Sequence, residues 1–329
     1  MENKTIAFFG CKKTTQFVID SLSDIVKVNY LFTISPLKNE KIIIPDYIDL
    51  KKYYKNKNID VYHVNRYDLK DSNDIKIISD LKIDLGFAIG WQRLIPEEVL
   101  NSINIGVFGM HGSSQDLPKG RGRSPMNWSI IEGREFFYTN LFKYDSGIDS
   151  GNILDTIKFS INKNDTAETM HFKNMISMSK LIKKNHSPLI SEKFKLKKQR
   201  ALKPTYYPKR EPEDSQIDWD QEINFIDRFI RAVTKPFNGA FTFLNSQMFT
   251  IYSAQIFDEI EFLHKDFETG LILEILSDKK ILVKCNGGVL LINSFESKVK
   301  PKKGDRFEIK YDKLKKFKKN NDGFYDLEK

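Results

Sequence analysis

Short apolar runs alternate with amphipathic stretches along the first part of the chain. Buried strands are predicted where the apolar runs are short, over residues 6–9, 28–33, 61–64, 85–89 and 106–110. Helices are predicted between these strands by their periodicity, over residues 14–22, residues 74–81 and the segment that begins at Pro96. This alternation indicates an α/β fold with a mostly parallel, doubly wound (Rossmann-like) sheet. Such a sheet binds its ligands outside the carboxyl ends of the strands.

The pattern changes after Pro125. Helices are predicted over residues 126–131 and 165–184, and longer strands over residues 137–144 and 153–161. Farther on, a helix is predicted over residues 221–232. Turn signals then separate short strands over residues 241–244, 249–255, 269–276, 281–285 and 289–294. Several short strands at this spacing favour a small β-barrel.

These patterns predict two domains, which suits a chain of 329 residues. The first domain is expected to cover residues 1–190, and a basic, polar linker is expected over residues 191–203. A smaller domain, built from a helix and a β-barrel-like sheet, is expected over residues 204–329.

The net charge of +9 raises the question of an anionic partner, because lysine is dense over residues 193–200 and 298–319. Such segments bind nucleic acid, anionic nucleotides or membrane surfaces. Solvated lysine-rich faces are the alternative. We favour this alternative, because lysine exceeds arginine in these segments and few aromatic residues are interleaved with it.

Features of a membrane or secreted protein are not found in the sequence. No apolar run approaches the roughly 18 residues that a membrane span requires, and the N-terminus does not resemble a signal peptide. Cys11 and Cys285 are the two cysteines, and they lie far apart in the sequence. We therefore expect a cytoplasmic protein with two structural thiols.

One histidine occupies a position that suits catalysis. His111 follows an apolar strand and opens a loop with Gly112, Ser113 and Ser114. This loop is too polar and too rich in glycine for a histidine of the core, and loops on a rigid frame commonly carry chemistry. We therefore expect His111 to be catalytic.

A carboxylate lies in a second glycine-rich loop. Asp149 is flanked by Gly147 and Gly151, and the local sequence alone favours an aspartate that caps a turn. Asp145 precedes it in the same loop and is interpreted as a turn residue.

Two arginines, Arg121 and Arg123, alternate with glycines directly after this first loop. An arginine flanked by glycine can present its guanidinium to a phosphate, or it can lie at the surface, and the sequence leaves both interpretations open. The histidines (His264 among them) and the cysteines do not have the spacing of zinc ligands, so no metal is expected. Neither a Walker loop nor a GxGxxG phosphate loop is present.

Together these motifs resemble a known family, the 10-formyltetrahydrofolate-dependent formyltransferases. Residues 111–128, HGSSQDLPKGRGRSPMNW, are similar to the loop that follows the catalytic histidine of the family, and residues 147–153, GIDSGNI, are similar to its aspartate loop. The C-terminal half adds YPKR at 207–210, EPED at 211–214, IDW at 217–219, IRAVT at 230–234 and GAFT at 239–242. The similarity covers nearly the whole chain, and it is closest to enzymes that formylate amino-sugar nucleotides.

The resemblance implies catalytic roles for His111 and Asp149. In the family reaction an amine attacks the formyl carbon and a tetrahedral oxyanion forms. An asparagine and the histidine stabilise this oxyanion, and the aspartate orients the histidine. Here the asparagine position is Gly109, and the loop after His111 is longer than in the family. Gln115 and Ser113 are the predicted substitutes for the missing hydrogen-bond donor.

The resemblance also places the ligands. The co-substrate 10-formyltetrahydrofolate is expected beside two loops, which contribute Gly90, Trp91, Gln92, Arg93, Leu94, Ile95, Asp145 and Ile148. The acceptor is expected beside Arg121, Arg123 and Asn127.

Our first hypothesis is an N-formyltransferase that acts on an amino-deoxy nucleotide sugar in polysaccharide biosynthesis. It is favoured because residues 35–50 lack the basic insertion typical of the tRNA-specific branch. A methionyl-tRNA formyltransferase that uses the +9 charge on tRNA is the second hypothesis. A catalytically impaired protein that binds folate or a nucleotide sugar is the third, because of Gly109. The sequence leaves homodimerisation open.

Overall fold

The computed structural model describes residues 4–42, 44–260, 266–310, 317, 319, 320 and 325. His264 and part of the basic segment 298–319, namely residues 311–316 and 318, lie outside the described residues. The chain forms two compact units. Unit 1 contains residues 1–121, 138–159 and 172–204, and unit 2 contains residues 122–137, 160–171 and 205–329.

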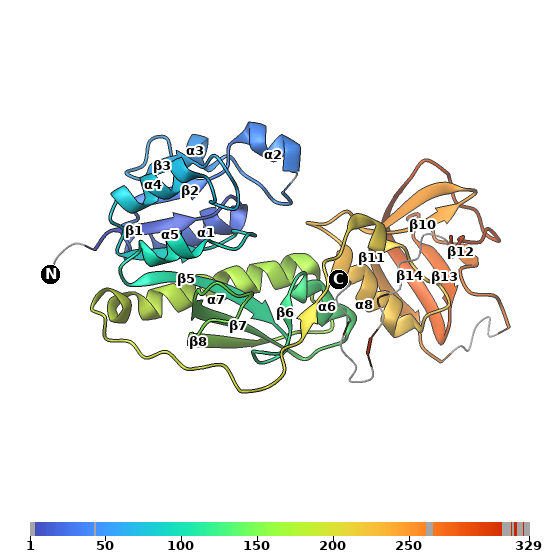
Figure 1. The fold of residues 1–329 in the computed structure, drawn as a ribbon. Helices are drawn as coiled ribbons and strands as arrows, with labels where there is room; N and C mark the ends of the chain where they lie inside the picture. The colour runs from blue at the N-terminus through green and yellow to red at the C-terminus, as the bar shows by residue number, and fades with distance from the viewer. Residues whose placement is uncertain are drawn as a thin grey trace. The chain divides into compact units, whose positions relative to one another are not determined.

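A seven-stranded sheet forms the centre of unit 1, drawn from blue to dark green in Figure 1. Its order is β3-β2-β1-β4-β5-β7-β8, and the first five strands in this order pair in parallel. The strands are β1 (Ile6–Phe9), β2 (Tyr30–Thr33), β3 (Asp60–His63), β4 (Leu85–Ala88), β5 (Gly106–Ser113), β7 (Phe136–Lys143) and β8 (Ile153–Ser160). β7 joins β5 in the antiparallel direction.

Two hydrophobic cores cover the two faces of this sheet, as a doubly wound fold requires. Alternation along β1 sends Ile6 and Phe8 into one core and Ala7 and Phe9 into the other. α1 (Lys13–Leu22) and α7 (Ala167–Ile190) supply side chains to the first core, and α4 (Ser72–Asp80) and α5 (Glu97–Asn101) supply the second. Two further short helices, α2 (Pro36–Ile42) and α3 (Leu50–Tyr53), are not predicted by the sequence pattern.

Unit 2 contains a five-stranded antiparallel sheet of order β10-β11-β14-β13-β12. Its strands are β10 (Ala240–Leu244), β11 (Gln247–Asp258), β12 (Ile272–Ile275), β13 (Ile281–Cys285) and β14 (Gly288–Ser297). Isolated bridges from Glu308 to Phe243 and from Arg306 to Leu271 add pairing along the sheet, as in a barrel-like domain. The indole of Trp219 is fully buried, stacks on Phe307 and donates a hydrogen bond to Thr242.

The helices of unit 2 are α6 (Pro125–Ile131), α8 (Ile223–Val233) and the 3-10 helix η1 (Pro212–Ser215). Two short strands, β6 (Arg121–Gly122) and β9 (Tyr206–Tyr207), pair with each other. α8 is strongly amphipathic, because its buried residues, among them Ile223, Ile226 and Ile230, recur at helical spacing. None of the helices in the described part of the chain is both long and apolar enough to cross a membrane.

The predicted fold class is confirmed, with a mostly parallel sheet and a smaller barrel-like domain. One local prediction is wrong: His111 does not leave the strand at Met110, because β5 continues to Ser113. The antiparallel strand β7 supplies the backbone partners for this extension, with His111 opposite Asn140. The tract predicted as a linker packs on unit 1, where Phe194 contacts the first core.

Candidate active site

His111 and Asp149 come together within unit 1. β5 fixes the backbone of His111 opposite Asn140, whose side-chain amide donates to the His111 carbonyl. The imidazole Nδ1 lies 3.3 Å from Oδ2 of Asp149, and the two side chains are 7% and 20% exposed. A carboxylate at this distance can accept a hydrogen bond from Nδ1 and orient the imidazole. The expected proximity of these side chains is therefore present, and their catalytic roles stay a prediction.

The other imidazole nitrogen also has a partner. Nε2 of His111 lies 2.8 Å from the carbonyl oxygen of Gly120. A carbonyl oxygen only accepts hydrogen bonds, so Nε2 is the donor in this arrangement. The ring thus lies between two acceptors, the Asp149 carboxylate and the Gly120 carbonyl.

The loop that carries Asp149 is held by a side chain from far along the chain. Asp149 has a left-handed backbone (φ 49°), which costs a non-glycine residue conformational energy unless the surroundings hold it. Gln199 supplies this restraint, because its amide nitrogen donates to the carbonyls of Asp149 (2.7 Å) and Gly151 (2.9 Å). Arg121 in turn donates to the amide oxygen of Gln199 at 2.6 Å. No motif in the sequence points to Gln199, which lies in the predicted linker.

The position that lacks the family asparagine is filled by a neighbouring ring. Gly109 and His111 are two residues apart on β5, so their Cα–Cβ directions point to the same face of the sheet. A Cβ on Gly109 would overlap Cε1 and Cζ of Tyr144 and would lie 2.5 Å from its hydroxyl oxygen. Burial, and to a lesser degree the charge of Asp149, raise the pKa of the Tyr144 phenol. This tyrosine was not singled out in the sequence.

The two predicted substitute donors lie in and beside the longer loop. Ser113 is fully buried, and its hydroxyl accepts a hydrogen bond from the Gln115 backbone nitrogen at 3.2 Å. Gly120 passes so close to this hydroxyl that a Cβ there would overlap it. The structure therefore gives Ser113 a packing role in the loop, and the donor role of both residues stays a prediction.

The first loop predicted to border the folate begins at Gly90, which has a left-handed backbone (φ 73°). The indole of Trp91 is 7% exposed and packs edge-on against Phe9 and Tyr67, so its ring belongs to the second core. The backbone nitrogen of Gln92 donates to the Tyr67 hydroxyl at 3.0 Å. The aromatic side chains of Phe9, Tyr67 and Trp91 therefore hold this loop against the second core.

The outer residues of the two predicted folate loops differ in exposure. Leu94 and Ile148 are about half exposed, at 54% and 52%, whereas Ile95 is buried. The guanidinium of Arg93 lies over the ring of Tyr67. Asp145 accepts hydrogen bonds from the Gly147 backbone and the Ser150 hydroxyl, which is the geometry of a turn residue.

The residues predicted to bind the acceptor are divided between the units. Arg121 is buried in unit 1, and its guanidinium reaches Gln199. Arg123 and Asn127 belong to unit 2. The Asn127 side chain is 7% exposed and donates to the Ala232 carbonyl at 2.7 Å. Contact of these side chains with an acceptor stays a prediction.

Two models of known protein families match the chain. A family model described as "Formyl transferase" matches residues 38–182, and a second, "Formyl transferase, C-terminal domain", matches residues 209–307. The chain belongs to the formyl transferase family. The two matches follow each other in the family order, and together they cover the site and most of unit 2.

Solved structures share the fold of this formyltransferase. An N-formyltransferase from Helicobacter canadensis, in complex with folinic acid and dTDP-3-aminofucose, matches with a TM-score of 0.61 and 19% identity, over 88% of this chain and 99% of that one. WlaRD, a sugar 3N-formyl transferase in the presence of dTDP and 5-N-formyl-THF, matches with a TM-score of 0.62 and 18% identity, over 91% and 99%. A methionyl-tRNA formyltransferase from Clostridium thermocellum matches with a TM-score of 0.53 and 19% identity, over 89% and 100%.

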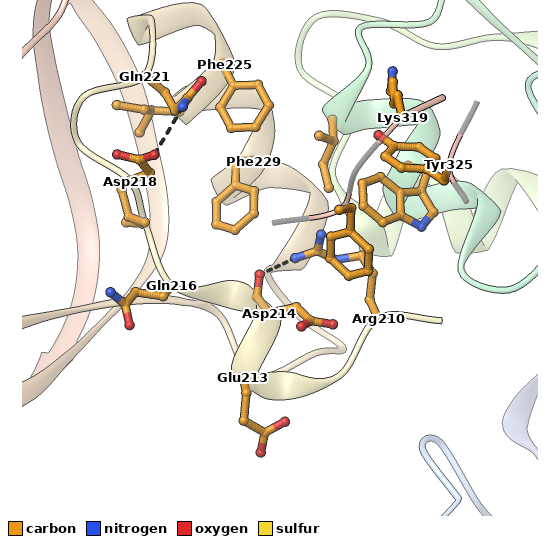
Figure 2. Close-up of a pocket in the computed structure, with 15 residues that line it drawn as sticks. Arg210, Glu213, Asp214, Gln216, Asp218, Gln221, Phe225, Phe229, Lys319 and Tyr325 are labelled. Atoms are coloured by element: carbon orange, nitrogen blue, oxygen red, sulfur yellow. Dashed lines mark hydrogen bonds between the residues drawn. The ribbon is translucent and has the colours of Figure 1, made fainter. Parts of the chain in front are cut away.

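Unit 2 of the formyltransferase contains a separate aromatic cavity of about 360 Å³, shown in Figure 2. Arg210 lies at its centre and donates to the Asp214 carbonyl, with its guanidinium 5.0 Å from the Trp128 ring and 5.4 Å from the Phe229 ring. Burial lowers the pKa of Arg210 to about 10. Five residues of the motifs that resemble the family at 207–214 and 217–219 thus line this cavity, namely Arg210, Glu213, Asp214, Ile217 and Asp218.

Across the part of the chain that the structure describes, no cluster of three or more histidine, cysteine, aspartate or glutamate side chains is placed to hold a metal ion.

Proposed function

We propose that this formyltransferase moves the formyl group of 10-formyltetrahydrofolate to the amine of an amino-deoxy nucleotide sugar. The observation that carries the proposal is the pair of His111 and Asp149, 3.3 Å apart, on a formyl transferase frame. The choice of acceptor is supported by two relatives whose structures hold dTDP or a dTDP-amino sugar together with a formylated folate.

The loops of unit 1 suit a folate. Leu94 and Ile148 expose apolar surface, and Gly90, at the start of the first loop, has a left-handed backbone. A flat heterocycle binds well to apolar walls that also offer backbone polar groups. We therefore assign the pterin to these two loops, with Trp91 supporting them from the core.

The proposed reaction conserves atoms and charge. The amine nitrogen attacks the formyl carbon, the new N–C bond forms, and the carbonyl electrons move to oxygen. The oxyanion electrons then re-form the carbonyl, the bond from the formyl carbon to N10 of the folate breaks, and N10 takes up the proton that His111 received from the amine. His111 accepts the proton that the amine loses, and Asp149 stabilises the protonated ring.

This role requires a change in the loop after His111. In the substrate-free structure Nε2 donates to the Gly120 carbonyl. To accept a proton from the amine, Nε2 must give up this bond and lose its own proton to solvent, while the ring keeps its proton on Nδ1, toward Asp149. We therefore expect residues 114–120 to shift when both substrates bind.

The test is a transfer assay with the full-length protein, 10-formyltetrahydrofolate and a panel of dTDP-, UDP- and GDP-linked amino sugars. Release of tetrahydrofolate measures the rate, and mass spectrometry detects the formylated sugar. His111→Ala is expected to lower turnover by about 10²–10⁴ with an unchanged circular dichroism spectrum. No transfer to any sugar by the parent protein would refute the proposal.

A methionyl-tRNA acceptor is the second candidate, favoured by the net charge of +9. It is tested in the same assay with aminoacylated initiator tRNA, at several salt concentrations. A rate that falls steeply with salt would indicate that tRNA phosphates are bound by lysine and arginine.

A further inference from the structure

We infer that the hydroxyl of Tyr144 is a catalytic hydrogen-bond donor, which binds the formyl oxygen as that oxygen gains negative charge. This inference rests on the proposed function, because it assigns a residue to the formyl-transfer step.

The position of the hydroxyl is set by β5. It lies 2.5 Å from the point that a Cβ of Gly109 would occupy. His111 is two residues farther along the same strand and faces the same side, a separation of about 6.6 Å. The Tyr144 hydroxyl and the His111 imidazole therefore lie beside neighbouring positions on one face of β5, and we place the formyl group between them. Tyr144 therefore places a polar group where the sequence has a glycine.

The ring is held in this place before any ligand binds. The backbone nitrogen of Tyr144 donates to the Val107 carbonyl at 2.8 Å, and its ring stacks on Phe142 at a centroid distance of 5.2 Å. Phe142 itself pairs with Gly109 across β5 and β7. Donors that are fixed in advance stabilise a developing charge without reorganising during the reaction.

The hydroxyl is available as a donor. Within the described residues, the Tyr144 oxygen makes no hydrogen bond to another side chain or to the backbone. Burial and the charge of Asp149 raise the pKa of the phenol, so it keeps its proton at neutral pH. In the step itself no bond to Tyr144 forms or breaks, because the phenol only donates to the oxygen that takes up the carbonyl electrons.

Tyr144→Phe tests the inference, because it keeps the ring that covers Gly109 and removes only the oxygen. Tyr30→Phe, which removes a hydroxyl from β2, is the matched control. The first readout is kcat and KM of transfer to the best acceptor. The second is calorimetric binding of a stable dideazafolate with a formyl group at N10 and of the same analogue without it. The ratio of the two dissociation constants reports the contact with the formyl group alone.

We expect Tyr144→Phe to lower kcat by about 10²–10³, as loss of one oxyanion donor does. The preference for the formylated analogue should fall by about three- to tenfold, the contribution of one hydrogen bond, and the KM for 10-formyltetrahydrofolate should rise by no more than the same factor. A kcat equal to that of the parent would overturn the inference and leave the proposed function intact.

The failure of the proposed function gives a different result. If the parent transfers formyl to no acceptor, the proposed function is wrong and the binding ratio alone decides the role of Tyr144. An unchanged ratio in Tyr144→Phe would then overturn the inference. A reduced ratio in Tyr144→Phe, with Tyr30→Phe equal to the parent, would support it.

Discussion

Replacement of Gly109 with alanine should destabilise the protein, because Tyr144 already occupies the space that a side chain needs. The new Cβ would lie 2.5 Å from the tyrosine hydroxyl oxygen and would overlap two ring carbons. Ordinary contacts are about 3.5–4.0 Å, so the ring would have to move by more than about 1 Å. Overpacking of this kind costs about 1–3 kcal/mol, which lowers Tm by about 2–12 °C for a unit of this size.

The assay is urea denaturation followed by circular dichroism, applied to Gly109→Ala, Tyr144→Ala and the double variant. In the Tyr144→Ala background the space is open, so Gly109→Ala should be neutral or slightly stabilising. The double-mutant cycle should therefore give a coupling free energy of about 1–3 kcal/mol. Gly86→Ala on β4 is the matched control, because its Cβ would meet no atom closer than 3.1 Å.

Two results would refute this reasoning. One is a Gly109→Ala protein as stable as the parent. The other is an equal penalty with and without the Tyr144 ring, which would place the strain in the β5 backbone instead.

Three further predictions concern Asp149, the Gln199 side chain that holds its loop, and Glu132. Asp149→Asn should lower turnover while folate binding persists, because a neutral amide no longer stabilises the protonated imidazole; an unchanged kcat would contradict this. Gln199→Ala removes two hydrogen bonds to the Asp149 loop, so it should reduce kcat and lower the free energy of unfolding by about 1–3 kcal/mol. A kcat equal to that of the parent in transfer assays would show that Gln199 is not a positioning residue. Burial alone would raise the pKa of Glu132, but a hydrogen bond from Lys319 and other favourable contacts lower it overall. A lowered folded-state pKa stabilises the fold above the unfolded value of about 4.3, and this stabilisation is lost as the pH falls through the folded-state pKa. Glu132→Gln should therefore lower the urea midpoint more at pH 7 than at pH 3; equal losses at both pH values would contradict this.

Local sequence patterns were sufficient to predict most of the strands. β1 and β13 begin and end at the predicted residues, because their apolar runs are bounded on both sides by polar residues or glycine. The end of β5 was missed for a physical reason. Residues 111–113 are polar and small, and they become strand only because β7 pairs with them from outside. The sequence of one segment alone does not show that it pairs with a distant segment.

The same limit explains the candidate site. His111 and Asp149 were predicted because each lies in a recognisable motif. Gln199 and Tyr144 were missed, because their importance depends on where distant backbone places them. Trp91 was expected to border the folate; its ring packs in the second core, and its contact with the folate stays a prediction.

The glycine at 109 and the tyrosine at 144 are best understood as one feature. A glycine at the family asparagine position suggested a protein that binds its ligands without turnover. That argument assumes that the donor must come from β5 itself. Stabilisation of an oxyanion depends on where a fixed donor lies and not on the segment that supplies it. The Tyr144 ring and hydroxyl occupy the space beside Gly109, and they can do so because glycine has no side chain there. The glycine therefore no longer argues against catalysis. Tyr144→Phe distinguishes a catalytic protein with a tyrosine donor from a protein that only binds its ligands, because the latter has no turnover to lose.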